Sequence, residues 1–140
     1  MDCDFSIAQG IYLVQPPHEL DLHNNFNFVG LNYSVEHRTI LLHWRRSNGE
    51  WVVGGTPATV TIEFREVTVF RFHPRNPAKA FTEDDCVNSF GYWVNEDWPE
   101  GVIIAEPSQP PDPRWLTAIE FMSGAIIAVR AASARARIEF

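Results

Sequence analysis

The sequence has only two cysteines, Cys3 and Cys86, among its 140 residues. They lie far apart, whereas a disulfide framework normally uses more cysteines at closer spacing. We therefore expect two thiols in a reducing compartment. A chain of this length can bury roughly two-thirds of its unfolded surface, so a core needs neither a disulfide nor a metal. The expected organisation is one domain spanning residues 1–140.

Long hydrophobic runs are also absent. The longest apolar run near the N-terminus, Ile11 to Val14, is far shorter than the h-region of a signal peptide, and acids stand where such a peptide carries Lys or Arg. No stretch approaches the roughly 20 apolar residues of a transmembrane helix. These absences predict a cytoplasmic protein without a membrane partner.

Positive charge is scarce. Eleven Lys and Arg residues stand against eighteen Asp and Glu residues, which gives a formal charge of −7. A net acidic domain repels a phosphate backbone and attracts basic partners. The Arg-rich spots at Arg45-Arg46 and at Arg135 and Arg137 are too small to reverse this balance. We expect no nucleic-acid partner and favour a basic protein.

Motifs with a known chemistry are missing as well: there is no HExxH, CxxC, GxSxG, Walker loop or dinucleotide fingerprint, so no cofactor is expected. The one metal-like grouping is HELDLH, because extended spacing would place Glu19, Asp21 and His23 on one face. We interpret this segment as a polar connection that leads into a strand. A metal-dependent enzyme that uses His18, Asp21 and His23 is kept as an alternative.

Aromatic residues, by contrast, are abundant, with ten Phe, five Trp and three Tyr, and many runs alternate with period two. RTILLHWRR (38–46) and ATVTIEFR (58–65) each place three apolar side chains on one face: Ile40, Leu42 and Trp44 in the first, and Val60, Ile62 and Phe64 in the second. Both patterns predict half-buried strands.

Irregular positions interrupt these strands. Gly30 within FNFVGLNY predicts a β-bulge or a bend, and the change of phase at residues 66–70 predicts a bulge or the start of a new strand. Ser123-Gly124, between TAIEF and AIIAV, predicts a two-residue hairpin turn. Residues 130–140 fit a strand or a helix, and their regular alternation favours the strand.

Only FTEDDCVNSFGY (81–92) is typical of a helix. Thr82 suits the N-cap, Glu83 and Asp84 complement the helix dipole in the first turn, and Gly91 follows as a stop signal. The acids are therefore explained without a metal. They also raise the pKa of the Cys86 thiol, so we do not expect a catalytic nucleophile there.

These elements predict a mostly β fold. We expect a single-domain antiparallel β-sandwich or partly open barrel, with one short helix near residues 83–90.

The segment GYWVNEDWPEG (91–101) is the candidate binding surface. Aromatic rings stand there beside amide and carboxylate groups, in Tyr92, Trp93, Asn95, Glu96, Asp97 and Trp98. Such a surface suits a sugar ring, a basic peptide or an Arg-rich partner. The alternative is that Tyr92 and Trp98 cover the open end of a β-sandwich.

Three segments carry a resemblance: RTILLHW, TVTIEFREVTVFRF and LTAIEFMSGAIIAVRAASARARI. They resemble small all-β bacterial proteins of uncharacterised families, some of which are grouped with immunity proteins of polymorphic toxin systems. The similar parts are Val60 to Phe72 and Ile119 to Ile138. The resemblance implies a cytoplasmic β protein that works by binding, and it carries no catalytic residues across.

The resulting hypothesis is a non-catalytic binding protein with a basic protein partner, for which neutralising a toxin is the most specific version. Its surface would consist of Trp93, Trp98, Glu96 and Asp97 with the acids of residues 83–85. A small-ligand or sugar-binding β domain is the alternative, beside the metal-dependent enzyme.

Overall fold

The computed structural model of the protein describes residues 1–94, 103–104 and 111–140. Its strands are β1 (Asp2–Cys3), β2 (Ser6–Ala8), β3 (Tyr12–Gln15), β4 (His18–Asp21), β5 (Phe26–Ser34), β6 (Thr39–Arg46), β7 (Thr59–His73), β8 (Val87–Trp93), β9 (Ile103–Ile104), β10 (Leu116–Phe121) and β11 (Ile126–Glu139). A short 3-10 helix, η1 (Phe81–Asp85), precedes β8. None of the helical structure in the described part is long and apolar enough to cross a membrane.

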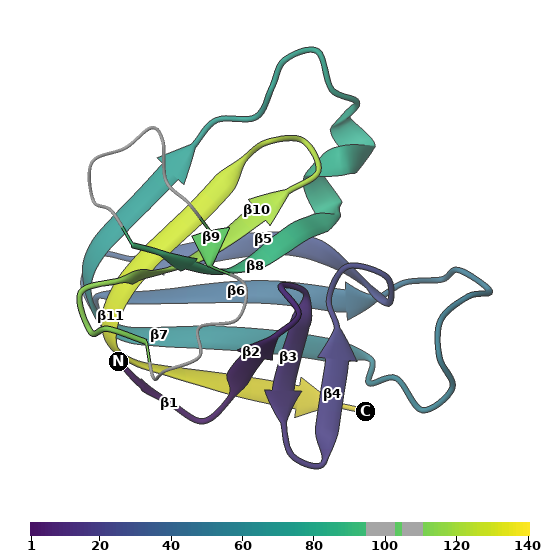
Figure 1. Ribbon diagram of the computed structural model, residues 1–140, viewed down its shortest axis with the longest axis horizontal. Coiled ribbons are helices and arrows are strands. Elements are labelled where there is room, and N and C mark those ends of the chain that lie inside the picture. The colour runs from purple at the N-terminus through teal and green to yellow at the C-terminus, as the bar shows by residue number, and fades with distance from the viewer. Residues whose placement is uncertain (95–102, 105–110) are drawn as a thin grey trace.

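The strands form two sheets. The larger has eight strands in the order β5-β6-β7-β11-β10-β8-β9, with β1 added parallel to β11, and the smaller has the order β2-β3-β4. Figure 1 shows the larger sheet curled into a half-barrel, with β5 and β6 in one arm and β8 and β10 in the other. The predicted mostly β fold is confirmed, and it takes the form of a partly open barrel.

The curl is carried by β7 and β11, which are 15 and 14 residues long and run from one arm into the other (Figure 1). Their register shifts between Arg130 and Ala131, and Glu66 on β7 has a positive φ of 54°. A bulge bends a strand and increases its twist, which lets one pair of strands serve both arms. The predicted bulges here and at Gly30 are confirmed, since the β5–β6 register shifts between Phe28 and Gly30.

The core lies on the concave face of this sheet. The alternating residues of β6 and β7 are buried as predicted: Ile40, Leu42, Trp44, Val60, Ile62 and Phe64. The same cluster includes Leu13 and Leu20 from the smaller sheet and Leu22, which directly follows β4. Each fully buried large side chain contributes about 1.5–3 kcal/mol relative to an exposed one, so both sheets are held by one core.

The predicted helix near residues 83–90 is only partly correct. The helical segment is a single 3-10 turn that ends at Asp85, and its N-cap is Ala80 without a side-chain hydrogen bond, so Thr82 is not the cap. Residues 87–90 belong to β8, which pairs with β10 and buries Val87 and Phe90. Burial against a partner strand overrides the local helical signals.

The hairpin of β10 and β11 is confirmed, but its turn is longer than predicted. Phe121 donates its N–H to the Ala125 carbonyl at 2.9 Å, and Gly124 donates to the Phe121 carbonyl at 2.9 Å. Gly124 has φ +86°, as the last residue of a three-residue hairpin loop requires. Residues 130–139 continue β11, so the strand interpretation of this segment is correct.

Candidate functional site

An apolar pocket of about 430 Å³ opens between the two arms of the half-barrel. Strand β5 forms one side, and the end of β7, η1 and the β10–β11 hairpin form the other. We call it the seam pocket. Its lining is Phe28, Val29, Leu31, Phe72, Pro74, Arg75, Phe81, Asp84, Asp85, Phe121, Ala125 and Ile127.

The floor of the seam pocket is part of the main core. Phe121 and Ile127 are almost fully buried. The Phe28 ring lies 4.8 Å from the Phe121 ring and 5.1 Å from the Trp44 ring, measured between centroids. These packed aromatic contacts fix the floor, so the pocket is formed before anything binds.

The rim of the seam pocket is apolar and faces solvent. Val29, Phe72 and Phe81 are each more than half exposed. Single exposed apolar side chains are common, but a contiguous group of them above an apolar cavity is typical of an interaction site.

One charged pair on the rim is already satisfied. Arg75 Nε donates to both carboxylate oxygens of Asp84, at 3.0 and 3.1 Å, and Arg75 Nη2 donates to the Lys79 carbonyl at 2.6 Å. The guanidinium also lies 4.5 Å from the centre of the Phe81 ring. Hydrogen bonds from Ser123 and then from Arg75 lower the pKa of Asp84. Arg75 therefore braces the rim and its charge is compensated.

Asp85 lies next to this pair, and its negative charge is not compensated by a cation among the described residues. Burial raises the pKa of its carboxyl, and the charge of Asp84 raises it further. Within the described part of the chain, no cation forms an ion pair with it. A carboxyl with a perturbed pKa in an apolar pocket is a common feature of binding sites.

Cys86 and His23 meet just behind η1, at 3.6 Å between Sγ and Nδ1. The same nitrogen hydrogen-bonds to the Val87 carbonyl oxygen. Because a carbonyl only accepts, Nδ1 carries the proton and cannot take one from the thiol. Burial raises the pKa of Cys86, and the nearby charges of Asp85 and Glu83 raise it further. The pair therefore holds a neutral thiol and joins the β4–β5 connection to β8.

The structure does not bring His18, Asp21 and His23 together around a metal. The His18 ring lies against Phe140, while the Asp21 carboxylate accepts hydrogen bonds from the backbone of His23 and from the backbone and side chain of Asn24. Across residues 1–94, 103–104 and 111–140, no three His, Cys, Asp or Glu side chains lie close enough to hold an ion.

The predicted binding loop is described only at its start. Asn95, Glu96, Asp97 and Trp98 lie outside the described residues. Tyr92 is half-buried near Trp115, and burial raises its pKa to about 12. Trp93 is 1% exposed and packs in a second core cluster with Leu116, so its ring does not face solvent. Binding through this loop stays a prediction.

Sequence reasoning missed the seam pocket. Its rim comes from β5 on one side and from β7 and η1 on the other; β5 is distant from the other two along the chain and meets them only because the sheet curls. The signal that was available is the pair Phe72 and Phe81, two Phe residues that flank a Pro-rich connection.

Comparison with family models, with curated proteins and with solved structures finds no match to this chain. Function is therefore argued from the geometry of the pocket.

Proposed function

We propose that the protein is a non-catalytic binding protein that takes an apolar side chain of a basic protein partner into the seam pocket. The observation that carries the proposal is an exposed apolar rim above a preformed apolar cavity, beside the uncompensated Asp85. The partner is basic, as the sequence predicts, but we place its binding surface at the seam pocket and not at the loop of residues 91–101.

The cavity supplies the anchor. Interfaces draw most of their binding energy from a few side chains buried in well-packed pockets. An aliphatic or aromatic side chain of the partner would contribute about 1.5–3 kcal/mol on burial, and the rim residues Val29, Phe72 and Phe81 would lose their exposure to water as well.

The charge supplies the selectivity. Arg75 is held by Asp84, so the remaining charge among the residues that line the pocket is the negative charge of Asp85. A Lys or Arg beside the anchor residue would pair with Asp85 in a partly desolvated place, where such a pair is stronger than at an open surface. The overall charge of −7 adds long-range attraction for a basic partner.

Strand β5 supplies a place for the partner backbone. It is the end strand of the larger sheet, and among the described strands it has a neighbour on one side only, β6. An extended segment can add to such an edge through main-chain hydrogen bonds while one of its side chains enters a pocket. Val29 and Leu31 place the pocket directly on this strand.

Neutralising a basic toxin is the most specific form of this proposal. It is supported by the resemblance of residues 60–72 and 119–138 to small all-β bacterial proteins of uncharacterised families, some of which are grouped with immunity proteins, and by the acidic charge of the chain.

The proposal is tested by selecting displayed random peptides on the immobilised protein and titrating the enriched peptides in solution. We expect peptides with a bulky apolar residue next to Lys or Arg. The double variant Phe72→Ser with Phe81→Ser should weaken their binding at least about tenfold, because one lost anchor contact of about 1.4 kcal/mol changes affinity by that factor.

The matched control replaces two equally exposed apolar residues away from the pocket, Val35→Ser with Phe140→Ser, which are 75% and 72% exposed. This control should bind like the wild type. Enrichment of acidic peptides, or equal binding by the rim variant and the wild type, would contradict the proposal.

A small amphipathic amine is a second candidate ligand. It is favoured by one observation, namely that the pocket floor reaches the core and its volume lies within the range of small-molecule sites. Aliphatic amines that raise the melting temperature of the wild type, but not of Asp85→Asn, would support this candidate.

A further inference from the structure

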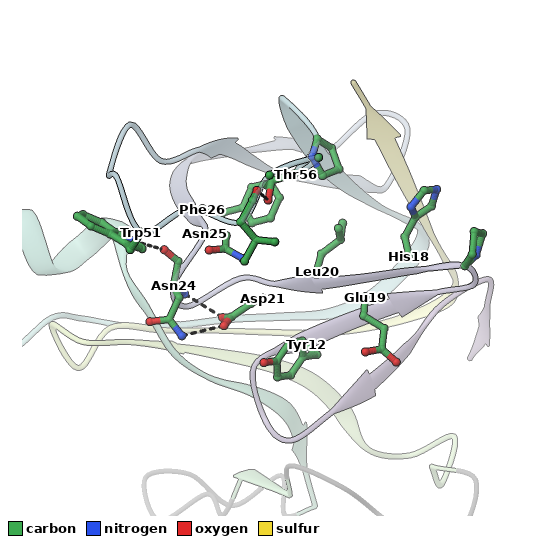
Figure 2. Close-up of a pocket in the computed structure, with 15 residues that line it drawn as sticks. Tyr12, His18, Glu19, Leu20, Asp21, Asn24, Asn25, Phe26, Trp51 and Thr56 are labelled. Carbon is green, nitrogen blue, oxygen red and sulfur yellow. Dashed lines mark hydrogen bonds between the residues drawn. The ribbon is translucent and has the colours of Figure 1, made fainter.

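A second, polar groove of about 580 Å³ shares no lining residue with the seam pocket. It runs between β4, the edge strand of the smaller sheet, and the loop of residues 47–58 that follows β6. Figure 2 shows Trp51 and Asn24 at one end of the groove and His18 at the other, with Thr56 on the loop side and Tyr12 and Glu19 on the sheet side. We call it the Trp51 groove.

Trp51 is an exposed ring with a fixed position. Its Nε1–H donates to the Asn24 carbonyl at 2.7 Å, which ties the loop to the β4–β5 connection (Figure 2). Gly49 lies against the six-membered ring, where any Cβ would collide with it. The side chain is nevertheless 67% exposed. The ring is therefore a preorganised aromatic platform, which has lost most of its freedom before a ligand arrives.

Neutral polar groups lie beside this platform. The Asn24 amide nitrogen donates to Asp21 at 2.7 Å, which leaves the amide oxygen as an acceptor. The Thr56 hydroxyl donates to the Val53 carbonyl, so its lone pairs face outward as acceptors. Asn25 and Tyr12 form no side-chain hydrogen bond within the described residues, and each can both donate and accept. The groove thus offers donors and acceptors in mixture, as a polyhydroxylated ligand requires.

The charges of the groove restrict the ligand. No Lys or Arg lines it, so a phosphate or an acidic sugar finds no lysine or arginine in the lining to pair with. Asp21 is buried and already accepts three hydrogen bonds from His23 and Asn24. A basic ligand would find only Glu19, which stands toward the end away from Trp51 (Figure 2). A neutral ligand fits best.

From these observations we infer that the Trp51 groove binds a neutral oligosaccharide. One pyranose ring stacks its C–H face on Trp51, and its hydroxyl groups hydrogen-bond to Asn24, Asn25 and Thr56. The groove continues from Trp51 toward Tyr12 and His18 (Figure 2), which leaves room for further sugar units. This site is independent of the seam pocket and of the protein partner proposed for it.

The test is a glycan array printed with neutral and acidic oligosaccharides, followed by titration of the strongest neutral oligosaccharide in solution. We expect binding with a change in tryptophan fluorescence. Trp51→Ala should weaken the binding roughly tenfold or more, and Trp51→Tyr, which keeps an aromatic face, should retain most of it. The rim variant Phe72→Ser with Phe81→Ser should bind the oligosaccharide like the wild type.

A second variant protects the test against a change in folding. Asn25→Ala leaves Trp51 in place, removes amide contacts only, and should weaken binding at an unchanged melting temperature. The inference is overturned if no neutral oligosaccharide binds at millimolar concentration, if binding survives Trp51→Ala, or if the groove binds only acidic glycans or basic peptides.

Discussion

Asp85 is a carboxyl held where its charge is unfavourable, since burial and the neighbouring Asp84 both raise its pKa. The unfolded chain gives this group an ordinary pKa of about 3.9. Between that value and the raised folded-state pKa, the folded protein binds more protons, so stability falls as the pH rises through this window. The Asp85 carboxylate lowers the stability of the fold at neutral pH. A binding role for its charge would explain why this carboxylate stands in the pocket.

Asp85→Asn is therefore expected to raise the melting temperature at pH 7 and to lose this advantage at about pH 3, where the wild-type carboxyl is protonated in both states. Asp84→Asn provides the matched control with the opposite sign. Hydrogen bonds from Ser123 and Arg75 lower the pKa of Asp84, so its charge stabilises the fold at neutral pH and that contribution is lost as the pH falls. Thermal melts across the pH range decide; equal effects of the two substitutions would contradict this assignment.

Cys86 gives a second residue-scale prediction. Its raised pKa keeps the thiol protonated at neutral pH, so it should react more slowly with a disulfide reagent than a free cysteine does. Asp85→Asn removes one of the charges that raise this pKa, and the pH profile of the reaction should move to lower pH. The exposed Glu36→Gln serves as the control and should leave the profile of Cys86 unchanged. A profile that does not move in Asp85→Asn would show that Asp85 does not act on the thiol.

The hairpin between β10 and β11 depends on one backbone conformation. Gly124 has φ +86°, and a Cβ there would meet Asn76 only at an ordinary contact distance of 3.7 Å. Gly124→Ala should therefore report backbone strain alone and cost about 1–2 kcal/mol of unfolding free energy in denaturant titration. Gly54→Ala, at an ordinary φ with open space around it, should change the unfolding free energy by less than about 0.5 kcal/mol. Similar costs for both would mean that the turn tolerates a side chain.

At the same scale, the strands were predictable from sequence, and the helix was predictable only in its first turn. Alternation fixes which face of β6 and β7 is buried, because the side-chain period of a strand is two, and Gly30 marked its bulge. The acids of residues 83–85 did favour a helical turn. The sequence does not show which strand pairs with residues 87–93. Val87 and Phe90 are buried only because β10 pairs with β8.

For the whole molecule, the curl of the larger sheet creates the seam pocket, and the packing of the smaller sheet creates the Trp51 groove. The bulges of β7 and β11 bring β5 opposite η1, and the smaller sheet, packed against the same core, places β4 beside the loop of residues 47–58 (Figure 1). Neither juxtaposition is readable from composition or period. The aromatic and acidic binding surface expected at residues 91–101 stays a prediction, and the two candidate sites consist of other residues.

The charge of the whole molecule predicts how a basic partner would respond to salt. With a formal charge of −7 and Asp85 at the pocket, association of a selected basic peptide should slow as ionic strength rises from about 0.05 M to about 0.5 M, because screening shortens the Debye length well below about 10 Å. Dissociation, which depends on the buried apolar anchor, should change less. Stopped-flow measurements at several salt concentrations separate the two rates, and an association rate independent of salt would contradict the electrostatic part of the proposal.

The most direct test of the seam pocket is methyl NMR of the protein titrated with a selected basic peptide. We expect the methyl resonances of Val29, Leu31 and Ile127, which line the pocket, to shift with the peptide, and those of Val35 and of Val53 in the Trp51 groove to stay in place. If Val29, Leu31 and Ile127 do not move while the peptide binds, the seam pocket is not the binding site.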